Sequence, residues 1–148
     1  MKILLAVDGS EYSDAAVEQV INRTWPQATQ VKVISAFEMP ISPTPETWSI
    51  PAEYFNELEQ AARSRATDAI ASAVDQLKTA QALTVESEVI EGSPKQVILD
   101  EAERWGADLI VVGSHGYRGW ERLLLGSVSQ AVVSHAKCSV EVVRKPRA

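Results

Sequence analysis

The chain has 148 residues, of which 45% are hydrophobic and 23% charged, and its net charge is −6. This composition is typical of one globular domain, residues 1–148, with a core of its own. It excludes a membrane-spanning helix, because no window approaches the roughly 18 apolar residues that such a helix needs. The acidic balance also disfavours nucleic-acid binding, which depends on basic patches.

The N-terminus and the cysteine count favour a cytoplasmic protein. The first apolar run ends at Asp8 and is shorter than the roughly seven to fifteen residues of a signal-peptide core. Cys138 is the only cysteine, so no disulfide forms within the chain. A single cysteine suits a reducing compartment, and we expect Cys138 to be a small apolar core residue.

In the N-terminal part, apolar runs alternate with helical spacing. Lys2–Val7 and Val31–Phe37 predict two strands. Between them, apolar residues on one face predict a helix that Ser13 caps and Pro26 ends.

A proline-rich segment follows the second strand. Glu38–Pro51 contains four prolines and predicts a long surface loop without regular structure, anchored by Trp48. Ala52–Ala82 is rich in Ala, Glu, Gln and Arg and predicts one long helix.

The C-terminal part continues the alternation of strand and helix. The predicted elements are the strand Leu83–Ile90, a helix capped by Ser93 and Gly106 with Pro94 first, the strand Leu109–Val112, the helix Ser127–Ala136 and the strand Ser139–Arg144. Glu86, Glu88 and Glu91 are expected on a solvated face. Five strands joined by helical crossovers predict an α/β fold, with a Rossmann-like open parallel sheet and helices on both faces.

Open sheets of this class bind ligands beyond the carboxyl ends of their strands. Asp8 directly follows the first strand, and the glycine-punctuated segment Gly113–Leu125 follows the fourth. Asp8 is therefore a candidate ligand contact, although it is also placed to cap the turn at Gly9-Ser10.

The glycine segment is compatible with phosphate binding. Gly113 and Gly116 permit close backbone approach and positive φ. Gly126-Ser127 opens a helix, whose free N–H groups and about half a positive charge favour an anion. The hydroxyls of Ser127 and Ser129 add donors. The alternative is a tight turn followed by an ordinary serine cap.

The full spacing carries a family resemblance. Gly113-x-x-Gly116, nine residues and then Gly126-Ser127 resembles the ATP-binding signature of the universal stress proteins. The opening Ile3-Leu4-Leu5-Ala6-Val7-Asp8-Gly9-Ser10 and the passage His135-Ala136-Lys137-Cys138 resemble that family as well. Two departures are Ser139, where the family often has proline, and Ala36, where larger apolar residues are frequent.

The resemblance implies a sheet of order 3-2-1-4-5 and an ATP site. Asp8 would contact the ribose or base side, and Ala6 and Ala36 would frame the adenine. The residues implied around the ribose and phosphates are Gly113, His115, Gly116, Gly126, Ser127, Val128 and Ser129. His115 is equally compatible with an ordinary loop residue. Mg²⁺ bridging the phosphates is compatible with such a site.

The resemblance also implies a homodimer that pairs the last strands, Ser139–Arg144, and an alternating apolar edge strand favours a partner. The chain lacks the Gly-x-x-x-x-Gly-Lys-Ser/Thr loop and the kinase signatures. We therefore expect a nucleotide-dependent regulatory protein in the stress response. The alternatives are a slow ATPase or other nucleotide hydrolase on the same fold, and a ligand-free interaction module. Arg118 and Arg122 are either phosphate contacts or solvated loop charges, and Trp120 is expected to pack over the ligand or a partner subunit.

Overall fold

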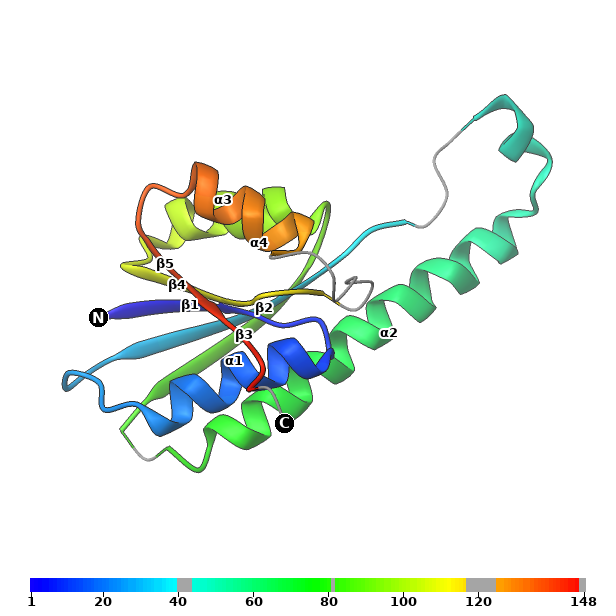
Figure 1. Cartoon of the computed structure of the whole chain (residues 1–148). Helices are drawn as coiled ribbons and strands as arrows, with labels where there is room; N and C mark the ends of the chain where they lie inside the picture. Colours follow the sequence, from blue (N-terminus) through cyan, green and yellow to red (C-terminus); the bar gives the residue numbers. More distant parts are fainter. Residues whose placement is uncertain (40–43, 81, 117–124, 147–148) are drawn as a thin grey trace.

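The computed structural model describes residues 1–39, 44–80, 82–116 and 125–146 (Figure 1). Its elements are β1 (Lys2–Ala6), α1 (Glu11–Asn22), β2 (Gln30–Phe37), the 3₁₀ helix η1 (Pro45–Ser49), α2 (Ala52–Leu77), β3 (Thr84–Glu91), α3 (Pro94–Trp105), β4 (Leu109–Gly113), α4 (Ser127–His135) and β5 (Ser139–Val143). The strands form one sheet of order β3-β2-β1-β4-β5, and every neighbouring pair is parallel. The predicted fold class and strand order are confirmed.

The sheet is buried on both faces. Because successive side chains of a strand point to opposite faces, Ile3 and Leu5 pack in the cluster with α1 and α2, whereas Leu4 packs in the cluster with α3 and α4. Figure 1 shows these two helix pairs on opposite sides of the sheet. The apolar run of β4 is buried throughout, as expected for a central parallel strand. No helix of the described residues is long and apolar enough to cross a membrane.

The predicted ends of α3 are confirmed, whereas the predicted start of α1 is wrong. Pro94 is the first residue of α3, and Gly106 ends it with a φ of 73°. In α1 the cap is Ser10, whose hydroxyl oxygen accepts from the Ser13 N–H at 3.2 Å. Ser13 lies inside the first turn, and its own hydroxyl donates to the Ser10 carbonyl at 3.0 Å.

The proline-rich segment also differs from its prediction. It contains η1, whose start is held by the Thr44 N–H donating to the Thr47 hydroxyl at 2.9 Å. Trp48 does not anchor the segment, because it is 79% exposed. The described part of the segment does lie at the surface as predicted, since η1 has no buried residue.

A charged cluster is buried between the sheet and α3. The Lys32 side chain on β2 is 8% exposed, and its Nζ lies 2.6 Å from carboxylate oxygens of both Glu88 on β3 and Glu101 on α3. Glu101 is 5% exposed and accepts two further bonds, both 2.7 Å, from Arg104. Glu86, Glu88 and Glu91 are exposed, so the predicted solvated face is confirmed, and Glu88 in addition binds the buried cation.

The cluster shifts the pKa values of its buried members. Burial disfavours the charged form of Glu101, but hydrogen bonds from Arg104 and Lys32 outweigh it and lower the pKa of this carboxyl. Burial likewise opposes the charge on Lys32, but the bonds to Glu101 and Glu88 raise its pKa. Each charge is thus stabilised by its partners.

This cluster predicts coupled effects on stability. Glu101→Leu leaves Lys32 with only the half-exposed Glu88, and we expect a loss of about 1–3 kcal/mol in the free energy of unfolding. Adding Lys32→Met removes the stranded cation and is expected to restore most of that loss. Urea unfolding of the single and double variants measures the coupling, and strictly additive losses would contradict it.

The same comparison has a defined pH dependence. Because the folded-state pKa of Glu101 is lowered, its contribution is present above the ordinary value of 4.5 and is lost as the pH falls toward the lowered value. The difference between wild type and Glu101→Leu is therefore expected to stay constant near pH 7 and to shrink below pH 4.5.

Candidate functional site

The predicted ligand residues gather at the carboxyl edge of the sheet. The Ser114 N–H donates to the Val143 carbonyl at 2.8 Å, which ties the segment after β4 to the end of β5. The Gly126 N–H in turn donates to the Ser114 carbonyl at 2.7 Å. The two ends of the glycine segment are therefore joined, although residues 117–124 between them lie outside the described residues.

Asp8 faces the glycine segment and also caps its own turn. Its Oδ1 accepts from the Ser10 N–H at 2.9 Å, as the turn-capping alternative predicts. Its Oδ2 lies so close to Gly116 that a Cβ added there would be 3.0 Å away. Asp8 and Gly116, 108 positions apart in the sequence, are thus neighbours at this edge. Asp14 belongs to the same acidic region, because burial, Glu18 and Asp8 raise the pKa of its carboxyl.

The glycines are needed because other parts of the protein's own backbone pack closely against them. A Cβ on Gly113 would lie 2.7 Å from the backbone carbon and oxygen of Tyr12. A Cβ on Gly126 would lie 3.2 Å from the Cα of His115. Gly113 and Gly116 do not use the positive φ that glycine permits, since the described glycines with positive φ are Gly9, Gly92 and Gly106.

The first turn of α4 presents backbone N–H groups at this edge. Gly126 occupies the cap position and offers no side chain to them. The first helical bond runs from the Gln130 N–H to the Gly126 carbonyl at 3.0 Å, so the N–H groups of Ser127, Val128 and Ser129 have no partner within the helix. This is the arrangement that favours an anion.

The two serines of this turn differ. Ser127 is exposed, so its hydroxyl is accessible from solvent. Ser129 is buried, and its hydroxyl lies 2.9 Å from the Ser114 carbonyl and 3.0 Å from that of Gly126. The Ser129 hydroxyl therefore holds the loop against the helix. The phosphate contact predicted for Ser129 is thus left to its backbone N–H.

Ala6 and Ala36 lie on one face of the sheet. Both are partly exposed, and both pack beside the cluster under α3 and α4, as does Val128. Small side chains at the ends of two adjacent strands leave this face less covered than the strand centres. Ala6, Ala36 and Val128 therefore all border the same apolar cluster.

His115 has neighbours that the sequence did not predict. Its Nδ1 lies 3.1 Å from the Ser114 hydroxyl oxygen, and its ring centroid is 5.1 Å from that of Tyr12. Tyr12 belongs to α1, so this contact connects the glycine segment with the helix that follows Asp8. No motif marks Tyr12 or Ser114, because their roles depend on contacts between distant segments.

Three predicted loop contacts, Arg118, Trp120 and Arg122, lie outside the described residues. Among the residues that are described, no group of three or more His, Cys, Asp or Glu side chains is placed to hold a metal ion. A cation here would therefore depend on ligands other than such a cluster.

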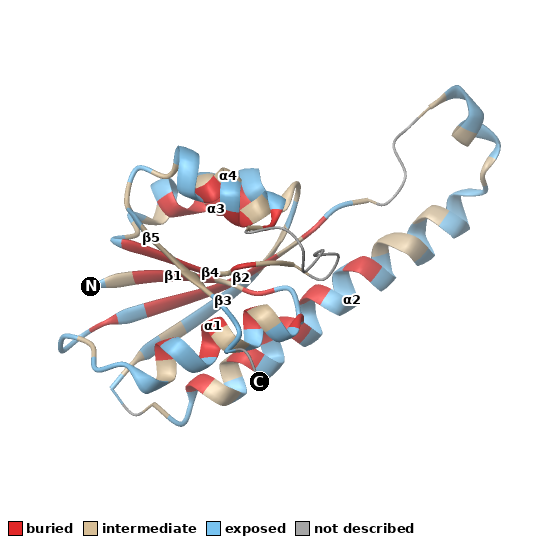
Figure 2. Ribbon diagram, in the orientation of Figure 1, coloured by how far each residue is buried: buried red, intermediate tan, exposed pale blue. Residues whose placement is uncertain are grey.

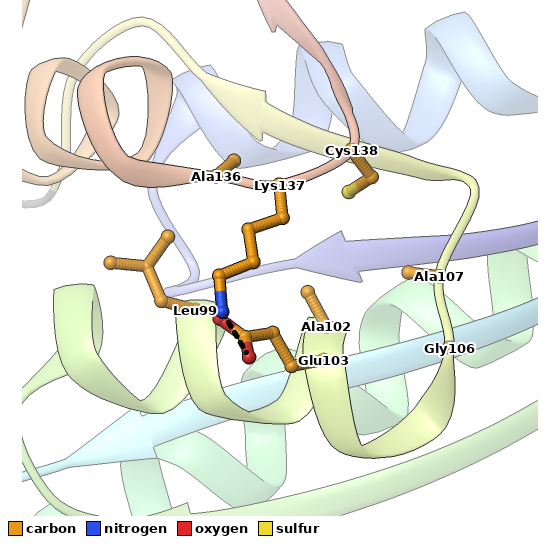
Figure 3. Close-up of a pocket in the computed structure, with 8 residues that line it drawn as sticks. All are labelled: Leu99, Ala102, Glu103, Gly106, Ala107, Ala136, Lys137 and Cys138. Carbon is orange, nitrogen blue, oxygen red and sulfur yellow. Dashed lines mark hydrogen bonds and ion pairs between the residues drawn. The ribbon is translucent and has the colours of Figure 1, made fainter.

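A pocket of about 150 Å³ lies at the opposite edge of the sheet. Figure 3 shows it between the end of α3 and the chain that leads into β5, with Cys138 on one side and Ala102 on the other. Lys137 donates to Glu103 across it at 2.9 Å. Cys138 is half-buried beside the core as expected, and burial raises the pKa of its thiol. Because this is the amino edge, the pocket is separate from the candidate site.

The contact at Gly113 predicts a test in the absence of any ligand. Gly113→Ala brings a Cβ onto the Tyr12 backbone, and we expect a loss of at least about 2 kcal/mol in the free energy of unfolding. Gly106→Ala meets no atom within 4 Å and costs only the left-handed backbone conformation, about 1 kcal/mol. Urea denaturation compares the two, and equal stability would show that Gly113 is not closely packed.

Comparisons with known proteins support the same family. The model of the universal stress protein family matches residues 1–144. A universal stress protein of Methanocaldococcus jannaschii is 32% identical over 151 residues, which cover 99% of this chain and 83% of the relative.

Solved structures share the fold. The universal stress protein UspA from Lactobacillus plantarum superimposes with a TM-score of 0.84 at 29% identity, over 97% of each chain. A universal stress protein family member from Arabidopsis thaliana with AMP bound has a TM-score of 0.71 at 22% identity, over 99% of this chain and 92% of the other. Given the family match, the M. jannaschii relative and the shared fold, the chain belongs to the universal stress protein family.

Proposed function

We propose that this chain is a cytoplasmic regulatory protein of the stress response that binds ATP at the carboxyl edge of its single domain. The observation that carries the proposal is the uncapped first turn of α4, held against the Gly113–Gly116 segment opposite Asp8. This arrangement offers backbone donors for phosphates and a carboxylate for a sugar hydroxyl at one place. The single cysteine supports the cytoplasmic assignment.

Different residues of the chain would contact the adenine, the ribose and the phosphates. Ala6 and Ala36 would receive the adenine on the face under α3 and α4, and Asp8 would accept from a ribose hydroxyl. The residues that would surround the ribose and phosphates are Gly113, His115, Gly116, Gly126, Ser127, Val128 and Ser129. The Arabidopsis structure, which has the same fold, holds AMP, and this supports an adenine nucleotide as the ligand class.

Mg²⁺ is proposed to enter with the nucleotide. Mg²⁺ commonly binds through substrate phosphates with few protein ligands, which suits a site whose described residues provide no cluster of ligands. Asp8 and Asp14 make the edge acidic, and a divalent cation would reduce their repulsion of the phosphates.

We propose regulation rather than turnover as the main role. Hydrolysis needs a positioned base for the attacking water. Among the described residues, the Asp8 carboxylate lies beside Gly116, and it already accepts the Ser10 N–H. Binding is therefore the role that its geometry supports. Slow ATP hydrolysis is the alternative, and a turnover assay tests it.

We also propose a homodimer through the last strand, Ser139–Arg144. The two edge strands of the sheet differ in how well they are protected against pairing with a strand of another molecule. The edge strand β3 carries Glu86, Glu88 and Glu91, and charged side chains discourage pairing. In β5 the single acid, Glu141, is bound by Arg23 at 2.7 Å. The β5 edge is thus the less protected of the two.

ATP binding is tested by calorimetry with and without Mg²⁺, after removal of any carried nucleotide. Asp8→Asn keeps an acceptor for the Ser10 N–H but removes the charge, and we expect affinity to fall about tenfold because bonds to ionised acceptors are stronger. Asp68→Asn, on the exposed side of α2, is the matched control. Absence of binding to the wild type, or unchanged affinity in Asp8→Asn, would reject the site. Phosphate release measured on the same samples separates a regulator from a slow ATPase.

The dimer is tested at Val142. Because the Val143 carbonyl accepts from Ser114, Val143 pairs inward toward β4, and the backbone of the preceding residue, Val142, points to the open edge. Val142→Pro removes that outward N–H and is expected to give monomers by sedimentation velocity. Val142→Ala shortens the side chain but keeps the N–H, and it should remain dimeric. A dimeric Val142→Pro protein would contradict this interface.

A further inference from the structure

Residues 44–61 form a projecting segment, which we call the arm. It consists of η1 and the first turns of α2, and Figure 1 shows it extending away from the sheet beyond the ends of β2 and β3. No residue of the arm is buried, and the buried residues of α2 begin at Ala62 (Figure 2). The arm therefore makes no contribution to the core that would explain its composition.

The arm exposes aromatic surface. Trp48 is 79% exposed and Tyr54 is 48% exposed, so the arm holds two of the four large apolar side chains that the described residues expose. Phe55 and Leu58 are only half-buried. They continue, at helical spacing, the stripe that Ala62 begins and that packs on the sheet farther along α2. The apolar face of α2 thus extends beyond the part of the sheet that covers it. An exposed apolar patch of this kind marks an interaction site.

The arm is also uniformly acidic. It carries Glu46, Glu53, Glu57 and Glu59 and no lysine or arginine. Its charge of −4 is thus most of the net −6 of the chain. One of the four, Glu59, lies 3.7 Å from Arg63 of the next turn, at the surface. Like charges disfavour the pairing of two arms, and they equally disfavour nucleic acid or an anionic lipid surface.

We propose that the arm docks a basic amphipathic segment of a partner protein, with Trp48 and Tyr54 as its anchors. Aromatic residues commonly dominate the binding energy of interfaces. An amphipathic helix whose apolar side chains are flanked by lysine or arginine would meet the stripe and the carboxylates together. This surface is distinct from the proposed nucleotide site and does not depend on it.

The probe is a pair of labelled helical peptides of about 18 residues, long enough to hold helical structure. Both have the same leucine spacing, and one carries lysines where the other carries glutamates. Fluorescence anisotropy is expected to show binding of the lysine peptide, weakening with salt, and none of the glutamate peptide. Trp48→Ala with Tyr54→Ala should weaken binding at least tenfold, and Glu53→Gln with Glu57→Gln should weaken it and flatten the salt dependence.

Two kinds of control distinguish an effect of the arm on peptide binding from effects of the overall negative charge and of unfolding. Val133→Ala on α4 and Asp68→Asn on α2 alter exposed residues outside the arm and should leave binding unchanged. Trp48→Ala should leave Tm unchanged, since Trp48 is not buried.

Equal binding of both peptides, or of the arm variants and the wild type, would overturn the proposal. Self-association lost in Trp48→Ala would assign the arm to a second copy instead. A Trp48-dependent change in emission when ATP alone is added would assign it to the nucleotide site.

Discussion

The contact between the end of β4 and the start of α1 fixes the geometry of the candidate site. At Gly113 the two backbones approach so closely that a Cβ would lie 2.7 Å from Tyr12. This contact sets where α1 begins, and with it the turn in which Asp8 binds the Ser10 N–H. From the same strand end, Ser114 binds the end of β5 and receives the Gly126 N–H. The absence of a side chain at Gly113 thus allows the ends of β4 and β5 and the starts of α1 and α4 to meet at one edge of the sheet.

The buried charges under α3 add a second constraint of a different kind. An apolar interface can slide, whereas Lys32 is satisfied only when both Glu88 and Glu101 are in reach. Such clusters contribute little net stability, because desolvation offsets much of the attraction. Their effect here is to hold α3 at one position over β2 and β3. Ala36, near the end of β2, packs against the cluster to which α3 contributes Val97 and Ile98.

The sequence predicted what local patterns determine. The apolar run 109–112 identified a buried strand, and Pro94 with Gly106 marked both ends of α3. Tertiary contacts decided the rest. The sequence predicted Ser13 as the cap of α1, whereas the cap is Ser10, whose N–H is bound in the turn at Asp8.

At the candidate site, the sequence predicted that Asp8 and the glycine segment meet at one edge of the sheet, and the structure brings them together there. The glycine spacing did not show that the glycines accommodate Tyr12 and His115. Glu88 is similar, since its solvent-facing pattern contains no sign of Lys32 on the neighbouring strand. The nucleotide roles came from family resemblance, because free N–H groups at a helix start are common to many folds.

The length of α2 connects two distant parts of the molecule. Its 26 residues form one helix about 39 Å long, without a break between the arm and the part that packs on the sheet. In its C-terminal half, Ala69 lies beside the turn that follows Asp8, since a Cβ on Gly9 would lie 3.6 Å from the Ala69 Cβ. One continuous helix therefore runs from the exposed arm to the edge of the sheet where Asp8 lies.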